Sequence, residues 1–318
     1  AGSGLQQVLM LLTFLHTRPG SILLVDEPDA HLHVFLQDAI YAELKRVAAA
    51  NNSQLILATH SEVIMDTVDA GELVMMFDKP RLMTEMVQRD ALKEAMRVLS
   101  HADIMRTQTA PGVVYVEGRT DLEILREWAK TLNHPVRKLL EGEIFWKPTN
   151  YPSEGGGDGI TSGTHYKAVR LVKDVPAFEL VDGDDGRGRE PTEVTGNGFQ
   201  RARWRRYEIE SYLYHPGALE RFVEREIGEQ AAGLAKQALM DHLTATNPPA
   251  FIADPLADLP FLRGTKAREA LIPPALQAAG LHGITYTRFH EIAALMKPEE
   301  IHPEVREKLD ALQKALNL

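Results

Sequence analysis

The sequence predicts an α/β protein with two successive α/β halves and a helical region after them, and three observations support this prediction. Up to about residue 215, short apolar runs alternate with segments of helical spacing. Two of the runs end in acidic residues, at Asp26-Glu27 and at Asp182-Gly183-Asp184. Open parallel sheets bind ligands at the carboxyl ends of their strands. From residue 216 onward the pattern is mostly helical, with proline-rich breaks at 248–260 and 273–274.

Composition limits the function classes. The 318 residues, 44 % hydrophobic and 25 % charged, are enough for two ordinary domains. The absence of cysteine excludes disulfides and thiolate metal sites, and it fits a cytoplasmic location. No stretch reaches the ~18 apolar residues of a membrane span, and the first residues do not resemble a signal peptide. The net charge of −10 disfavours nucleic-acid binding unless the acids cluster around bound cations.

The first half is expected to alternate helices with strands of a parallel sheet. Helices are expected at residues 5–16 and 34–50, and strands at 22–25, 55–58 and 73–77. The continuous apolar runs predict strands that are buried on both faces.

The second half is expected after a helical segment, 78–110, that ends in a linker-like stretch, Thr107 to Gly112. A strand at 113–116 is followed by a helix with Thr120 and Glu123 as its capping box. The elements expected after it are a long loop at 147–166, a helix at 167–174, a strand at 178–181, and a strand running into a helix at 203–213.

Asp26-Glu27 after Ile-Leu-Leu-Val has the form of a Walker B sequence. Asp26 would hold Mg²⁺ beside nucleotide phosphates, and Glu27 would orient or deprotonate the attacking water. The alternative is an ordinary junction between a strand and a loop, with solvated acids.

Further motifs in the first half resemble ABC-type ATPases, in the order signature, Walker B, D-loop and switch histidine. Gly2-Ser3-Gly4, followed by Gln6 and Gln7, resembles the signature, and Asp29 to His33 and His60 occupy the D-loop and switch positions. The resemblance implies that Ser3, Gly4, Asp26, Glu27 and His60 contact nucleotide. G-x-x-x-x-G-K-[ST] does not occur, so we expect a piece of a longer protein that binds ATP only at full length, as a homodimer or higher oligomer.

The second half has acids at the ends of two expected strands. Glu117 ends one strand, Asp121 lies one helical turn later, and Asp182 and Asp184 leave another strand. Adjacent parallel strands would bring the four carboxylates together, and their repulsion would require cations such as Mg²⁺ or Mn²⁺. The alternative is two unrelated acidic loops. Both segments resemble the motifs of Toprim, a domain shared by topoisomerases, bacterial primases and several nucleases.

Glu208 and Glu210 are expected to share one face of a strand, with Ile209 toward the core. They resemble a third acidic segment of OLD-family Toprim domains, which implies ligands for a second metal ion. An amphipathic strand with a solvated acidic face is the alternative. Lys266 is the candidate cation that would offset charge developing on a scissile phosphate. A solvated surface lysine is equally compatible with its position.

An ABC-type half followed by Toprim resembles the OLD family of nucleases. This implies residues 1–108 as the carboxy-terminal half of an ABC ATPase domain, 109–215 as the Toprim core and 216–318 as an associated helical region. The implied function is two-metal hydrolysis of DNA phosphodiesters, with Glu117, Asp182, Lys266 and Glu27 as catalytic residues. Arg201, Arg203, Arg205 and Arg206 are candidate contacts to the DNA backbone. A DNA-clamping or signalling ATPase with a vestigial Toprim site, and a nuclease acting on RNA, remain open.

Overall fold

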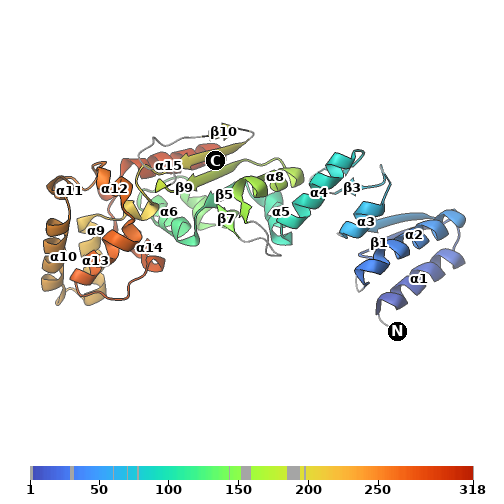
Figure 1. Cartoon of the computed structure of the whole chain (residues 1–318), viewed down its shortest axis with the longest axis horizontal. Coiled ribbons are helices and arrows are strands. Elements are labelled where there is room, and N and C mark those ends of the chain that lie inside the picture. Colours follow the sequence, from blue (N-terminus) through green and yellow to red (C-terminus); the bar gives the residue numbers. More distant parts are fainter. Residues whose placement is uncertain are drawn as a thin grey trace. The chain divides into compact units, whose positions relative to one another are not determined.

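The computed structural model describes residues 3–28, 32–59, 61–69, 71–76, 79–142, 144–151, 159–184, 194–196 and 198–317. The chain forms two compact units, Ala1–Glu94 and Ala95–Leu318, which are treated separately below (Figure 1). The expected domain boundary at 108/109 falls within the second unit, at the end of helix α5 (His101–Thr109). Among the described residues, no helix is long and apolar enough to cross a membrane.

The first unit is built on two parallel strands, β1 (Ile22–Asp26) and β2 (Gln54–Ala58). Helices α1 (Ser3–Thr17) and α2 (Val34–Ala50) pack against them through a core that contains Leu15, Leu44, Val47 and Ala48, with Leu23 and Leu55 from the strands. The parallel pairing and both long helices confirm the sequence prediction for this part.

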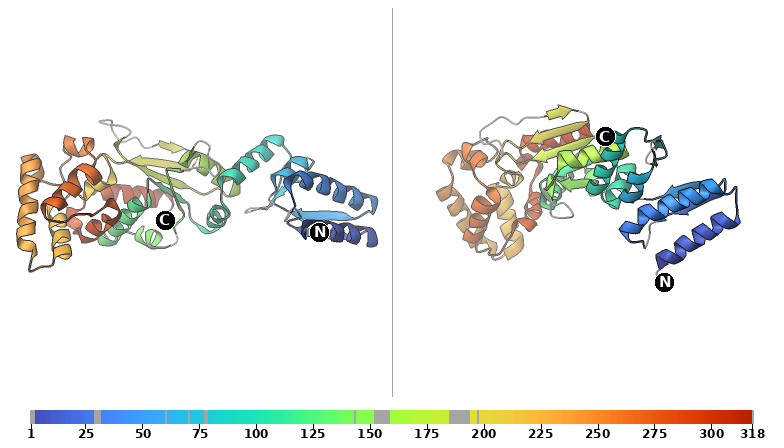
Figure 2. Two further views of the ribbon diagram at one scale, coloured as in Figure 1. Left: turned by 60° about the horizontal axis from the view of Figure 1, so that its bottom comes forward. Right: turned by 45° about the vertical axis from the view of Figure 1, so that its right-hand side comes forward.

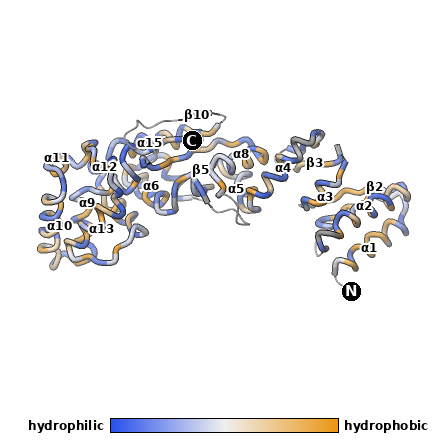
Figure 3. Tube along the Cα trace, in the orientation of Figure 1, coloured by the Kyte–Doolittle hydropathy of each residue, from blue (hydrophilic) through white to orange (hydrophobic). Residues whose placement is uncertain are grey.

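The other face of this strand pair is not covered by the described residues. Leu24 is 73 % exposed and Ile56 is 56 % exposed, although the strands are strongly hydrophobic (Figure 3). The prediction of strands buried on both faces is therefore wrong here. The reason is that both helices pack on the face that carries Leu23 and Leu55, and side chains alternate between the two faces of a strand.

The rest of the first unit consists of short elements. The third expected strand is reduced to β3 (Val74–Met75), which pairs antiparallel with β4 (Arg81–Leu82) instead of extending the parallel sheet. Helix α3 (Glu62–Thr67) begins after Ser61, whose hydroxyl accepts a hydrogen bond from Ile64 N. Helix α4 spans Met86–Val98.

The second unit contains a five-stranded sheet in the order β10-β11-β9-β5-β6. All neighbours are parallel except β10 and β11. The strands are β5 (Val113–Val116), β6 (Trp146–Pro148), β9 (Ala177–Val181), β10 (Val194–Gly196) and β11 (Phe199–Arg203). Every residue of β5 and β9 is buried, and these two strands are parallel neighbours, as the sequence predicted.

Helices cover both faces of this sheet. Val114 and Phe178 face α6 (Arg119–Thr131) and α15 (Pro303–Ala315) in one large core, whereas Tyr115 faces α8 (Ser162–Val172). On that second face, Tyr115 Oη lies 2.7 Å from Nδ1 of His165. The sheet is therefore the middle layer of a three-layer α/β arrangement, and α5 packs beside α8.

Two local expectations in this unit are wrong. Helix α6 begins at Arg119 after Gly118, and Thr120 lies inside its first turn, where its hydroxyl donates to Asp121 at 3.3 Å. Thr120 is thus not the N-cap, because Gly118, two residues earlier, takes that position in an extended conformation. The expected loop at 147–166 includes strand pairs and the start of α8, with β7 at Asn150–Tyr151 and β8 at Ile160–Thr161.

The segment after β11 is not the expected strand. Glu208 is extended, and Ile209–Tyr212 forms a 3₁₀ turn, η2. The chain after β9 approaches this segment very closely: Gly183 N donates to Tyr207 O at 2.9 Å, and a Cβ at Gly183 would lie 2.2 Å from Arg206 O. Only glycine fits at such a contact, and the contact turns residues 204–208 away from a regular ladder.

The last third of the chain is helical, as predicted, and its helices group beside the sheet (Figure 2). Many of its apolar side chains belong to the same core as the sheet, so this region is an integral part of the second unit. Its elements before α15 are α9 (Pro216–Ile227), α10 (Ala232–Thr246), α11 (Pro249–Ala253), α12 (Pro260–Gly264), the π-helical turn η3 (Ala267–Leu271), α13 (Ile272–Ala278), η4 (Tyr286–Arg288), α14 (His290–Leu295) and η5 (Pro298–Glu300), and α7 (Arg137–Glu141) follows α6.

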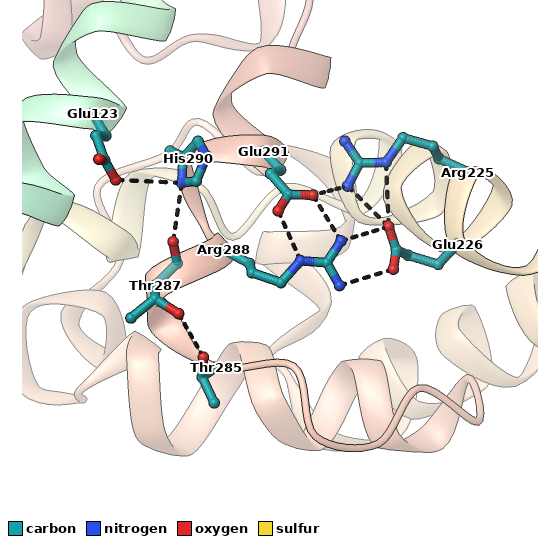
Figure 4. A network of polar contacts seen from close by, with 8 residues as sticks. All are labelled: Glu123, Arg225, Glu226, Thr285, Thr287, Arg288, His290 and Glu291. Atoms are coloured by element: carbon teal, nitrogen blue, oxygen red, sulfur yellow. Dashed lines mark hydrogen bonds and ion pairs between the residues drawn. The ribbon is translucent and has the colours of Figure 1, made fainter.

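An ion-pair network ties three of these helices together (Figure 4). The Arg288 guanidinium donates to Glu226 of α9 and to Glu291 of α14, both at 2.8 Å, and Arg225 contacts the same two carboxylates. On the same side, His290 Nδ1 lies 3.6 Å from Glu123 of α6. Networks hold geometry better than isolated surface pairs, so the helical region is fixed against α6.

Candidate functional site

The first candidate site lies where β1 ends. Asp26 is the last residue of β1, and Glu27 follows with φ of 50°, a left-handed conformation that is unusual for a residue with a side chain. Its main-chain amide donates to Ala58 O at 2.8 Å, and Gln7 Nε2 contacts its carbonyl oxygen at 3.5 Å. Such strain costs about 1–3 kcal/mol and is concentrated at functional positions. The strained residue therefore lies at the expected Walker B position.

The other expected nucleotide contacts are only partly described. Gly4 is buried in the first turn of α1, and Ser3 begins that helix. Gly2, the start of the D-loop segment at 29–31, and His60 lie outside the described residues. Gln7 is the described link between the signature-like segment and Glu27.

The second candidate site is an acidic cluster at the carboxyl ends of β5 and β9. Glu117 directly follows β5, Asp121 lies in the first turn of α6, and Asp182 directly follows β9. Asp182 N donates to Glu117 Oε1 at 3.1 Å, and Glu117 N donates to Asp121 Oδ2 at 3.2 Å. The structure thus brings these three predicted carboxylates together because parallel neighbours end at the same edge of the sheet.

Glu208 and Glu210 join the cluster from η2. Ile209 N donates to Asp182 Oδ1 at 3.1 Å, which fixes η2 beside the end of β9. Glu208 is 1 % exposed and Glu210 is 2 % exposed. Their approach to the cluster was expected, but from a strand; the observed 3₁₀ turn buries both carboxylates together with Ile209.

Burial and mutual repulsion make this cluster electrostatically unfavourable. Burial, followed by the charge of Glu117, raises the pKa of Asp121 to about 6. Burial also raises the pKa of Asp182 well above its usual value, with Glu117 and Asp121 adding to the effect. For Glu210, burial and then the charge of Glu208 raise the pKa to about 8. Carboxylates in this situation are stabilised by a bound cation.

Two further predicted residues lie at the margin of the cluster. Asp184 is half-buried two residues beyond Asp182, and it makes no hydrogen bond or ion pair within the described part of the chain. Lys266 precedes η3 and lies 3.4 Å from Glu269 with 40 % of its side chain exposed. Burial raises the pKa of Glu208, and the charge of Lys266 partly opposes this rise, so Lys266 lies within electrostatic range of the cluster.

The donor set fits a hard divalent cation. Every side chain of the cluster offers carboxylate oxygens, the ligands that Mg²⁺ and Mn²⁺ prefer. Across the described ranges, no three or more His, Asp or Glu side chains are arranged so that they could hold a metal ion as they stand. Main-chain amides occupy one oxygen each of Glu117, Asp121 and Asp182. Metal binding would exchange some of these bonds for coordination.

The sequence reasoning missed Arg268. Its main-chain amide donates to Glu208 Oε1 at 2.6 Å, and its Nε lies 3.5 Å from Glu208 Oε2. Arg268 follows Lys266 by two positions, so the same Gly-containing turn that suggested a cation there offered this second candidate.

The four candidate DNA-contacting arginines are divided by the structure. Arg206 is 2 % exposed, and its guanidinium donates to main-chain oxygens of Ser211, Leu256 and Ala257. The prediction that Arg206 contacts DNA is wrong because this buried cage leaves it no exposed surface. Arg201 pairs with the buried Glu179, and Arg205 pairs with Glu307.

Parts of this chain are similar to known proteins. Residues 1–66 match the family model described as "AAA domain, putative AbiEii toxin, Type IV TA system". A solved structure described as the C-terminal region of the Xanthomonas campestris pv. campestris OLD protein is similar, with a TM-score of 0.35 and 19 % identity, covering 66 % of this chain and 97 % of that chain. No curated protein matches the chain. The N-terminal segment is thus similar to an AAA-type ATPase domain.

Proposed function

We propose that this protein is a cytoplasmic OLD-type nuclease whose Toprim-like second unit hydrolyses DNA phosphodiester bonds with Mg²⁺ or Mn²⁺. The observation that carries the proposal is the convergence of Glu117, Asp121 and Asp182 at the ends of two parallel strands, with Glu208 and Glu210 beside them. A buried set of carboxylates with raised pKa values is a poor structural element unless cations neutralise it.

The residues divide into ligands and supporting groups. Glu117, Asp121, Asp182 and Glu210 would hold the ions, and Asp184 and Glu208 are the remaining candidates from the sequence. Bound ions would supply Lewis-acid activation of the phosphodiester and of the attacking water. Main-chain amides of Asp182 and Ile209 fix the carboxylates, and Lys266 adds positive charge near Glu208.

Cleavage of supercoiled plasmid by this chain tests the proposal. Nicking or linearisation is expected with Mg²⁺ or Mn²⁺ and not with EDTA, and it should be lost in Asp182→Asn. Asp174→Asn is the matched control, because its carboxylate is exposed and pairs with Arg170 on the surface. Equal cleavage by wild type and Asp182→Asn, or no cleavage with any metal by either this chain or a longer form, would refute the proposal.

A second candidate function is a DNA-clamping or signalling ATPase with an inactive Toprim site. The strained Glu27 at the end of β1 and the match of residues 1–66 to an AAA model favour it. Glu27→Gln in a form of the protein that includes the phosphate-binding loop discriminates the two. If ATP turnover and all DNA-dependent activity depend on Glu27 but not on Asp182, the ATPase is the function. In either case we propose that the ATPase half mediates assembly of a homodimer or higher oligomer.

The substrate is proposed to be DNA, and RNA is the alternative. Both offer the same phosphodiester to a metal site, so the cluster alone does not distinguish them. Competition between matched DNA and RNA oligonucleotides in the cleavage assay identifies the substrate. Preferential inhibition by RNA would replace DNA in the proposal.

A further inference from the structure

Arg268 brings the helical region into contact with the acidic cluster. It is the second residue of η3. The amide of Arg268 makes a 2.6 Å hydrogen bond to Glu208 Oε1. Its own side chain stays 36 % exposed, whereas Glu208 is almost completely buried. The main chain of Arg268 is therefore held by Glu208, and its side chain remains partly exposed to solvent.

The guanidinium of Arg268 faces negative charge from several directions. Burial alone would lower its pKa, but the carboxylates of Glu208 and Glu210 outweigh burial and raise it. Asp182, on the other side of the cluster, contributes in the same sense. Arg268 thus stays charged and lies within electrostatic range of two of the three segments that carry the proposed metal ligands.

The geometry of the pair leaves most of the guanidinium unused. A purely structural Arg–Glu pair normally joins two N–H groups to two carboxylate oxygens side by side. Here the short bond to Glu208 comes from the main chain, and the closest guanidinium atom, Nε, lies 3.5 Å from the carboxylate. Within the described residues, Nη1 and Nη2 of Arg268 make no hydrogen bond. By contrast, the amine of Lys266 is directed to Glu269.

A planar, permanently charged fork beside a metal-ligand cluster suits one kind of ligand. Guanidinium N–H groups match the spacing of two phosphate oxygens, and their charge does not depend on pH in the working range. We propose that Arg268 binds a backbone phosphate of the substrate beside the cluster through Nη1 and Nη2, and that Glu208 is the positioning residue that holds Arg268 for this contact. The proposal rests on the proposed nuclease function for the identity of the phosphate.

Binding without metal separates this role from catalysis. The probe is a fluorescein-labelled DNA oligonucleotide in EDTA, measured by anisotropy at low salt, together with a series in which one phosphate at a time is a neutral methylphosphonate. Arg268→Gln should weaken binding roughly tenfold, which corresponds to about 1.4 kcal/mol, because a charge-assisted pair is lost. Arg268→Lys should recover part of the affinity, because it restores charge but not the planar fork.

The matched control is Arg225→Gln. Its side chain is 38 % exposed, close to the value for Arg268, and it pairs with Glu226 and Glu291 within the network of Figure 4. It removes one positive charge from the same helical region without touching the cluster, so binding should be unchanged. Equal weakening by both substitutions would overturn the proposal, because net charge alone would then explain the effect.

The methylphosphonate series keeps the proposal testable if Arg268→Gln folds poorly. For the wild type, one neutral linkage should weaken binding roughly tenfold, the loss expected for one charge-assisted contact. In Arg268→Lys the penalty at that linkage should shrink, because the two changes remove the same contact. If no single linkage matters to the wild type, or if the penalty is unchanged in Arg268→Lys, Arg268 does not bind a backbone phosphate.

Steady-state cleavage completes the test. Arg268→Gln and Glu208→Gln should both lower kcat/KM mainly through KM, since Glu208→Gln keeps the acceptor for the Arg268 amide but releases the guanidinium. An unchanged KM in both variants, in a wild type that cleaves, would overturn the role of Arg268 and leave the nuclease intact. Conversely, a wild type that cleaves nothing while Arg268→Gln still loses metal-free binding would overturn the nuclease and support the phosphate contact.

Discussion

The main-chain amide of Asp182 donates to Oε1 of Glu117 at 3.1 Å and thereby joins the ends of β9 and β5. One strand end thus orients the carboxylate of the other. The side chain of Asp182 is used in turn by Ile209 N at 3.1 Å, so the three acidic segments are connected through main-chain donors. The ligand geometry is set by the backbone, while the charges themselves oppose folding.

Neutralising Asp182 should stabilise the metal-free protein. Its pKa is raised by burial and by its acidic neighbours, so ionised Asp182 costs folding free energy at pH 8. Asp182→Asn keeps an oxygen for Ile209 N and removes the charge. We expect a gain of about 1–2 kcal/mol, or roughly 2–8 °C in melting temperature. Differential scanning fluorimetry in EDTA measures it, and a lower melting temperature for the variant would contradict the repulsion argument.

Divalent metal should make the wild type more stable than Asp182→Asn. Mn²⁺ at about 100 times its Kd should stabilise the wild type by ~2.7 kcal/mol, because the ion binds only the folded cluster. Asp121→Asn should reduce this shift, whereas Asp174→Asn, at an exposed site, should keep it. Titration of the melting temperature with Mn²⁺ provides the measurement. Identical shifts in all three proteins would place the metal elsewhere.

Arg206→Leu should destabilise the second unit and disorder η2. The buried guanidinium donates to main-chain oxygens on two segments and lies 4.9 Å over the Tyr212 ring. Loss of these charge-assisted bonds should cost about 3 kcal/mol or more. Urea unfolding measures the loss, with Arg306→Leu on the surface of α15 as control. Equal free energies of unfolding for the wild type and Arg206→Leu would mean that the main-chain carbonyl groups around Arg206 contribute little to stability.

Acid should destabilise the fold through His302. Burial, and then the charge of Arg206, lowers the pKa of His302 from its usual 6.5 to about 4. The unfolded chain therefore binds the proton more tightly, so stability is complete above about pH 6.5 and falls as pH drops toward 4. At about 1.4 kcal/mol per pKa unit, the loss is on the order of 3 kcal/mol.

His302→Asn tests this assignment. His302 is the N-cap of α15, where its Nδ1 accepts from Glu304 N at 3.1 Å, and asparagine can cap a helix without titrating. Urea unfolding at pH 7 and at pH 4.5 should give a smaller difference for the variant than for the wild type. The same difference in both proteins would assign the acid sensitivity to other groups.

The parts of the fold that depend on local sequence pattern could be predicted from the sequence. Continuous apolar runs located β1, β2, β5 and β9, and helical spacing located α1 and α2 within two residues. The convergence of Glu117 and Asp182 followed from the rule that parallel neighbours end together. Periodicity and the residue types at strand ends are properties of short segments, so they can be recognised without the tertiary structure.

The errors arose where distant contacts decide the conformation. Residues 203–213 were expected as a strand running into a helix, but the approach of Gly183 to Arg206 and the main-chain oxygens around the Arg206 guanidinium impose a turn instead of the strand. Arg206 looked like one of four surface arginines because nothing nearby in sequence marks its partners at 255–257. Arg268 was missed for the same reason, since its acidic partner Glu208 lies 60 positions away.

The support of η2 by α15 has a consequence for biosynthesis. Glu304, near the start of α15, accepts hydrogen bonds from Arg205 N at 3.0 Å and from the Tyr212 hydroxyl, and so holds the segment that carries Glu208 and Glu210. A nascent chain that has emerged only as far as residue 215 carries all the cluster's acids but lacks this brace. Domains fold as units during translation. The acidic centre therefore matures only after α15 has left the ribosome.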